Sequence, residues 1–93
     1  MKSIITNDKK CYFCDSTDNI HFHHVFRGKN RQTSERYGLK VPLCAGHHNI
    51  NNYSVHNNKG LNLLLCEEIQ RKAMEHYGWS ITKFIELFGR NYI

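Results

Sequence analysis

The stretch Asn19-Ile-His-Phe-His-His-Val-Phe-Arg27 decides the fold. Its compact, β-rich composition predicts a strand over residues 20–26, with residues 40–43 (Lys-Val-Pro-Leu) as the hairpin partner. Pro42 has no amide hydrogen, so the partner strand should lie at a sheet edge or at a strand end. Successive strand residues point to opposite faces, so His23 and His24 should diverge unless the strand ends or bends there.

Two metal-type motifs lie on either side of this stretch. Cys11-Tyr-Phe-Cys14 precedes it, and Cys44-Ala-Gly-His47 follows with the same spacing and an imidazole in place of one thiolate. Two such ligands can reach one tetrahedral ion when a tight turn joins them. We therefore predict a structural zinc site made of Cys11, Cys14, Cys44 and His47. A redox Cys-x-x-Cys pair and cysteines that merely pack are the alternatives, and no βαβ pattern surrounds Cys11 to support the redox interpretation.

With His47 assigned to zinc, the middle of the chain still holds His23, His24, His48 and His56. One imidazole can ligate a divalent ion while its neighbour stays free, neutral at pH 7 and able to take a proton from water. On a helix, His47 and His48 are about 100° apart, so one can face the zinc while the other faces a second ion.

Length and charge restrict the protein class. A chain of 93 residues predicts one domain, residues 1–93, with a thin core that needs support besides packing. Thirteen Lys and Arg against eight Asp and Glu give a net charge of +5, which favours a polyanion such as nucleic acid as partner. The first residues contain no apolar signal core, and the longest apolar run is Leu63-Leu64-Leu65-Cys66. We therefore expect a cytoplasmic, intracellular protein that does not enter a membrane.

The segments around the hairpin are polar. Residues 1–10 should be a frayed lead-in with a short strand at Ile4-Ile5. Residues 27–38 are expected to form a long polar loop, which is either a solvated loop or an arm that contacts phosphates, since arginine forks match phosphate oxygens. Its four cations are the candidate DNA-binding residues: Arg27, Lys29, Arg31 and Arg36.

The second half of the chain predicts helices. A short or irregular helix is expected over residues 45–53, a turn at Lys59-Gly60, and an amphipathic helix over residues 61–77. Cys66 has no second metal-type residue at a fixed spacing, so we predict a buried thiol and give a metal ligand as the less favoured alternative. Ser80 should cap a last helix. The apolar stripe of that helix is expected to be core: Ile81, Phe84, Ile85 and Phe88.

These motifs together resemble a known family. Cys-x-x-Cys, His23-His24, Leu43-Cys44-x-x-His47-His48-Asn49 and Val55-His56 occur in the order typical of the HNH, or ββα-metal, endonucleases. The run from His24 to Leu39, with Val55-His56-Asn57, is similar to the small phage-encoded HNH group related to the recombination-enhancement nucleases. The resemblance covers residues 11 to about 77. It implies an α+β fold with a ββα-metal, treble-clef-like core over residues 11–58 and a helical part over residues 61–93.

The resemblance also implies roles. His24 matches the general base, and His23, His48 and His56 match the ligands of a catalytic divalent ion. Arg27 would steady the phosphate. The family's middle asparagine, usually a few residues before the Leu-Cys, has no counterpart there, so Asn49 is assigned an orienting role.

The implied activity is hydrolysis of DNA phosphodiester bonds, in a phage- or prophage-encoded enzyme. Its cofactors would be a structural Zn²⁺ and a second ion, Mg²⁺, Mn²⁺, Ni²⁺, Co²⁺ or Zn²⁺. The family implies weak base specificity, with a protein partner directing cleavage. Two other functions stay open: a zinc-stabilised nucleic-acid-binding or scaffold module without cleavage activity, and a thiol redox protein.

Overall fold

A two-stranded antiparallel hairpin lies at the centre of the fold. Strand β1 (His21–His24) pairs with β2 (Lys40–Leu43), with His21 opposite Leu43 and His24 opposite Lys40. The computed structural model describes all 93 residues. Besides the two strands it contains a 3-10 turn and helices: η1 (Gly28–Asn30), α1 (Arg31–Tyr37), η2 (Gly46–Ile50), α2 (Lys59–Tyr77) and α3 (Ile81–Phe88). The predicted hairpin is confirmed, with a first strand shorter than residues 20–26.

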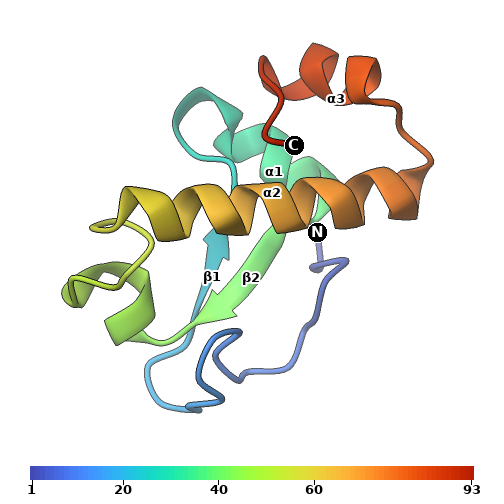
Figure 1. Ribbon diagram of the computed structural model, residues 1–93. Helices are drawn as coiled ribbons and strands as arrows, with labels where there is room; N and C mark the ends of the chain where they lie inside the picture. Colours follow the sequence, from blue (N-terminus) through green and yellow to red (C-terminus); the bar gives the residue numbers. More distant parts are fainter.

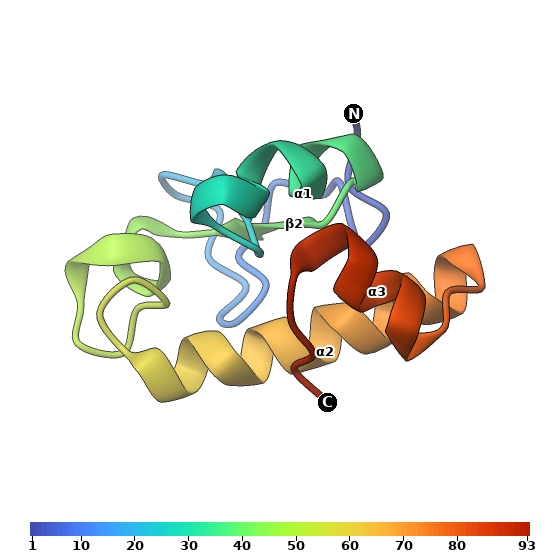
Figure 2. The same cartoon turned by 90° about the horizontal axis from the view of Figure 1, so that it is seen from above.

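Helices cover both sides of the hairpin. Helix α2 crosses one face of the strands, α1 lies on the other side, and α3 folds back above α2 (Figures 1 and 2). The Phe26 ring, just after β1, contacts the rings of Phe84 and Phe88 with centroids 5.3 and 4.8 Å away. The predicted α+β class, with C-terminal helices after a small ββα-like core, is confirmed. Thirteen buried apolar residues form the core: Cys11, Val25, Phe26, Leu39, Val41, Leu43, Val55, Leu65, Cys66, Ile69, Ala73, Phe84 and Phe88.

The predicted loop over residues 27–38 is wrong, because this segment forms η1 and α1. Only Ser34 of α1 is buried, and its hydroxyl donates to the carbonyl of Phe26 at 2.8 Å and accepts from the Phe26 amide at 3.2 Å. Gly38 ends the helix with a φ of 70°, a left-handed conformation that favours glycine. A Cβ there would lie 2.5 Å from the carbonyl oxygen of Lys2, so this position also needs the absence of a side chain.

The N-terminal lead-in is attached to the hairpin and forms no strand at Ile4-Ile5. The buried Ser3 hydroxyl donates to the Lys40 carbonyl at 2.6 Å, and the Ile4 amide donates to the Gly38 carbonyl at 3.0 Å. Both bonds involve irregular backbone and not a regular strand. The apolar pair Ile4-Ile5 was therefore a misleading sign of a strand in this polar segment. The segment is therefore ordered rather than frayed.

The C-terminal helices follow their capping residues. Asn58 accepts from the Leu61 amide at 2.9 Å, so α2 begins at Lys59 and the predicted turn at Lys59-Gly60 is wrong. Ser80 accepts from the Lys83 amide at 3.1 Å, as predicted. Within the stripe of α3, Phe84 and Phe88 are buried, whereas Ile81 and Ile85 are 42% and 40% exposed, so half of the expected core stripe faces solvent.

None of the helices combines the length and the hydropathy needed to cross a bilayer.

Candidate metal centres

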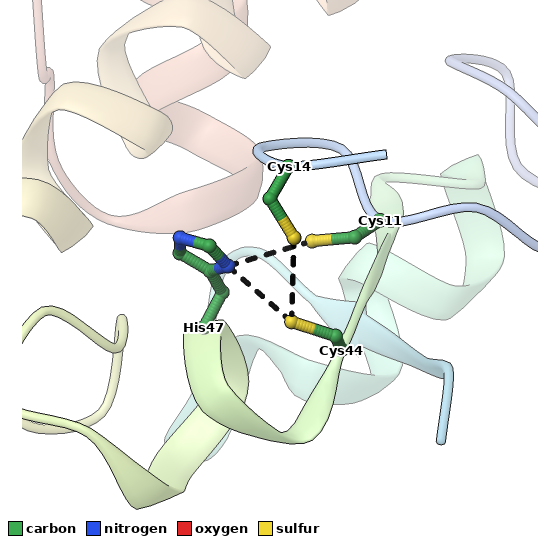
Figure 3. A group of neighbouring side chains, drawn as sticks. All are labelled: Cys11, Cys14, Cys44 and His47. Atoms are coloured by element: carbon green, nitrogen blue, oxygen red, sulfur yellow. Dashed lines mark hydrogen bonds between the residues drawn. The ribbon is translucent and has the colours of Figure 1, made fainter. Parts of the chain in front are cut away.

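The first candidate centre joins the N-terminal loop to the end of the hairpin. Cys11 and Cys14 lie on the loop, Cys44 directly follows β2, and His47 lies on η2; the four side chains point toward one another (Figure 3). Cys14 Sγ lies 3.7 Å from Cys44 Sγ. His47 Nδ1 lies 3.7 Å from Cys11 Sγ and 3.3 Å from Cys44 Sγ. The four predicted zinc ligands therefore lie together.

These separations fit one tetrahedral zinc ion. Zinc bonds of about 2.3 Å to sulfur and about 2.05 Å to nitrogen, at tetrahedral angles, place two sulfurs about 3.8 Å apart and a sulfur and a nitrogen about 3.6 Å apart. Burial acts to raise the pKa of the Cys11 thiol, but amide donors of Cys44, Phe13 and Cys14 outweigh burial and lower it. A thiolate held by backbone N–H groups is the form that zinc requires.

The loop that carries Cys11 is fixed by backbone bonds. The Tyr12 amide donates to the Pro42 carbonyl at 2.7 Å, and the Cys11 amide donates to the Ser16 carbonyl at 2.7 Å. Asp15 closes the turn with a φ of 62°. Pro42 cannot donate to a neighbouring strand, but its carbonyl accepts the Tyr12 amide. The cysteine turn is therefore attached to β2 independently of its side chains.

The second candidate centre consists of three histidines from three segments. His23 lies on β1, His48 on η2 and His56 in the loop before α2, and their nearest ring nitrogens all lie within 4.8 Å of one another. The Val55 amide donates to the His47 carbonyl at 2.8 Å, and the His56 amide donates to the His48 carbonyl at 3.2 Å. These two bonds place His56 beside His48. As predicted, adjacent His47 and His48 serve different clusters.

His23 is the buried member of this centre. It is 4% exposed, and its Nε2 has no hydrogen-bond partner. Burial, followed by the neighbouring His48 and His56, lowers the pKa of His23 to about 3, so the ring is neutral at pH 7. A buried polar atom without a partner costs about 1–3 kcal/mol, and such atoms are uncommon in folded proteins. A metal ion on the lone pair of Nε2 would satisfy it.

The spacing of the other two rings also fits a shared ion. His48 Nε2 lies 3.2 Å from His56 Nε2. Two imidazole nitrogens at about 2.05 Å from a tetrahedral ion lie about 3.3 Å apart, and at right angles around an octahedral ion about 2.9 Å apart. Burial lowers the pKa values of both rings, and so does the positive charge of Arg27. Three neutral imidazoles are a donor set suited to Zn²⁺, Ni²⁺ or Co²⁺.

Arg27 holds His56 in a form that does not bind metal. Its guanidinium donates to His56 Nδ1 at 2.5 Å. A guanidinium can only donate, so Nδ1 must be the acceptor and the neutral ring carries its proton on Nε2. An ion bound to Nε2 of His56 requires the tautomer that carries its proton on Nδ1. In that tautomer the Nδ1–H and the arginine N–H face each other as two donors, so they cannot form a hydrogen bond. Binding of an ion to His56 therefore requires Arg27 to move away.

His24 points away from this cluster, as expected for neighbours on a strand. Its Nε2 lies 2.7 Å from Oε1 of Glu35 on α1. Glu35 also pairs with the Lys40 ammonium at 3.0 Å and with the amino group of Met1. The Met1 amino group, then His24 and Lys40, holds the pKa of Glu35 well below its usual range. Glu35 was not identified from the sequence, because its helix was expected to be a loop.

One cavity connects His24 with the three-histidine centre. It has a volume of about 310 Å³, and its lining is His21, Phe22, His23, His24, Arg27, Arg31, His48 and His56. His21 is a further residue that the sequence did not assign to the site. It is exposed, and its ring stacks on His48 with centroids 5.7 Å apart and an angle of 25°. Two faces of β1 thus contribute side chains to one basic cavity.

The remaining candidate residues do not line this cavity. Lys29 is on η1 and Arg36 is on the last turn of α1, both exposed and outside the cavity. Asn49 is exposed, and its carbonyl accepts from the Asn57 side chain at 3.0 Å, while its own amide group bonds to none of the histidines. No hydrogen bond to a histidine thus supports the orienting role assigned to Asn49. The residue that bonds to His24 is Glu35.

Comparison of the chain with protein-family models, curated proteins and solved structures finds no match. The fold and the two clusters therefore carry the functional interpretation.

Proposed function

We propose that this protein is a metal-dependent endonuclease of the HNH type that hydrolyses DNA phosphodiester bonds. The observation that carries the proposal is the buried, unpartnered Nε2 of His23, which lies beside His48 and His56 at the wall of a basic cavity that His24 also lines. A neutral ligand set and a separate histidine within one cavity are the two parts that metal-assisted hydrolysis needs. The second cluster, Cys11, Cys14, Cys44 and His47, would hold a zinc ion that stabilises the fold.

The residues divide the work as follows. His24 is not part of the ligand set, so it accepts the proton of the attacking water. A divalent ion held by His23, His48 and His56 would polarise the scissile phosphate and stabilise charge on the leaving oxygen. Three protein ligands leave positions open for water and phosphate, and Zn²⁺, Ni²⁺, Co²⁺, Mn²⁺ and Mg²⁺ are the ions to test. Arg27, once released from His56, is free to contact a phosphate oxygen.

The proposed substrate is DNA, contacted mainly through phosphates. The net charge of +5 favours a polyanion, and Arg27 and Arg31 line the cavity where a phosphate would enter. Lys29 and Arg36 extend the positive charge along η1 and α1. The proposal includes no helix or strand that contacts base edges, so the choice of target sequence would depend on a protein partner.

The test is a nicking assay on supercoiled plasmid with a series of divalent ions and with excess chelator. His24→Ala should lower the cleavage rate by about 100-fold or more, while zinc content and second-site ion binding stay unchanged. His23→Ala should lose both cleavage and second-site binding. His76→Ala is the matched control, because His76 is exposed on α2 and outside the cavity. Cleavage at the parent rate by His24→Ala would remove the assignment of the base. Salt-sensitive DNA binding without cleavage under any ion would favour a binding module instead.

A further inference from the structure

We infer that Glu35 is a positioning residue for His24, and that it makes Nδ1 the ring nitrogen that accepts the proton. This inference rests on the proposed function and deepens it. The contact that carries it is the 2.7 Å separation between Glu35 Oε1 and His24 Nε2. The pair joins β1 to α1, two segments that the sequence alone does not bring together.

The contact fixes the tautomer of His24. An ionised carboxylate has only acceptor oxygens, so the hydrogen of this bond must come from Nε2 of the imidazole. The positive groups around Glu35 keep its carboxylate ionised at neutral pH. A neutral imidazole with a proton on Nε2 has its lone pair on Nδ1. Nδ1 is therefore the nitrogen through which His24 can take a proton from water.

The structure also holds Glu35 itself in place. Lys40 lies opposite His24 in the hairpin, and its ammonium contacts both carboxylate oxygens, at 3.0 and 3.3 Å. The neighbouring Ser34 fixes α1 to the end of β1 through two bonds to Phe26. The position of the Glu35 carboxylate is thus restrained both by its own helix, α1, and by Lys40 on β2. A restrained acceptor limits both the tautomer and the rotation of the His24 ring.

A purely structural role is the competing explanation, since the same contacts link α1 to the hairpin. The Glu35 side chain is 39% exposed, and ion pairs at this exposure contribute little to stability. His24 is more enclosed, with its side chain 14% exposed, and it lines the cavity of the histidine centre. The two explanations therefore differ in what removal of Glu35 changes. A positioning role lowers the rate of the chemical step, and a structural role lowers the thermal midpoint.

The experiment compares Glu35→Ala, Glu35→Gln and Glu35→Asp with Glu86→Gln, an exposed carboxylate on α3 that serves as matched control. Glu35→Ala should lower kcat on plasmid by about 10- to 100-fold, with KM, zinc content, second-site ion affinity and thermal midpoint unchanged. Glu35→Gln keeps an acceptor oxygen and should retain more activity than Glu35→Ala, and Glu35→Asp should restore part of the loss. In ¹⁵N-labelled parent protein, His24 should show a hydrogen-bonded Nε2 proton that disappears in Glu35→Ala.

Cleavage by Glu35→Ala at the parent rate would overturn the inference. So would a loss of activity that only follows a lowered thermal midpoint or lost ion binding, and so would a His24 proton found on Nδ1 in the parent. The proton resonance needs no cleavage activity. If the parent cuts no DNA with any divalent ion, the proposed function fails and the positioning role fails with it, whereas the resonance still reports whether the Glu35–His24 pair exists. Loss of kcat with the resonance unchanged overturns the positioning role alone.

Discussion

The proposed ion at the three-histidine centre must displace Arg27 from His56, so replacing Arg27 should tighten ion binding there. The guanidinium bonds to His56 Nδ1 and leaves the proton of that ring on Nε2. Binding an ion breaks that bond and moves the proton. Arg27→Met keeps a long apolar side chain but removes both the donor and the charge. The ion then no longer has to displace a hydrogen bond.

The size of the effect follows from the exposure of the pair. Hydrogen bonds to charged groups contribute about 1.5–3 kcal/mol to stability. Arg27 and His56 are both exposed, so solvent screening reduces the contribution of their bond to about 1 kcal/mol or slightly above. A difference of about 1.4 kcal/mol corresponds to a factor of about ten in Kd. Arg27→Met should therefore lower the Kd of the second site by about 5- to 10-fold. Arg27→Lys keeps a positive charge but not the guanidinium geometry, so its Kd should lie between the two.

The assay is calorimetric titration of Ni²⁺ or Zn²⁺ into protein that already contains one equivalent of zinc. Arg31→Met is the matched control, because Arg31 is an exposed arginine that lines the same cavity and bonds to no histidine. Its Kd should stay close to that of the parent. A second-site Kd for Arg27→Met that equals or exceeds the parent value would refute the competition. In contrast to its tighter ion binding, Arg27→Met should cleave DNA more slowly if Arg27 contacts the phosphate.

Three further perturbations test the fold and the pH response. Cys44→Ala or excess chelator should unfold the chain, which would be seen as a loss of far-ultraviolet circular dichroism. The reason is that structural zinc contributes about 10–16 kcal/mol, whereas the total stability of a domain is about 5–15 kcal/mol. An unchanged spectrum would contradict a structural zinc. Ser34→Ala removes both bonds to Phe26 and should cost about 1–3 kcal/mol in urea unfolding, with exposed Thr82→Ala as control. The pKa of His23 is about 3 in the folded chain and about 6.5 when unfolded, so the unfolded state takes up the proton first. In protein carrying only the structural zinc, the unfolding free energy should therefore fall progressively as the pH drops from about 6.5 towards about 3, by up to about 1.4 kcal/mol per unit from this group, and His23→Gln should reduce that slope.

The cysteine cluster was predictable because its ligands occur as two pairs at a short, fixed spacing, whereas the set His23, His48 and His56 followed from the family resemblance. Cys11 and Cys14 are two residues apart within a turn, and His47 and His48 are neighbours whose directions follow from helical geometry alone. The hairpin that brings His23 beside η2 followed from two β-rich segments. For the cysteine cluster and the hairpin, local chemistry was enough to define which residues lie together.

Glu35 was missed because its contact to His24 depends on a helix without an apolar period. Helix α1 buries only Ser34, so hydrophobic periodicity gives no signal for it. The one sequence feature that could have revealed it is Gly38, a typical helix end. Ile81 and Ile85 illustrate the opposite limit. Their spacing predicts a buried stripe, but burial depends on whether another element covers that side of α3, and none does.

The most direct test of the central claim is a crystal structure with anomalous scattering recorded at the zinc and nickel absorption edges. Two separate peaks are expected. One should lie at bonding distance from Cys11, Cys14, Cys44 and His47, and the other from His23, His48 and His56, with the Arg27 guanidinium turned away from His56. A single peak at the cysteines, with His56 still bonded to His48 and to Arg27 at saturating ion, would contradict a second metal centre and the nuclease proposal that depends on it.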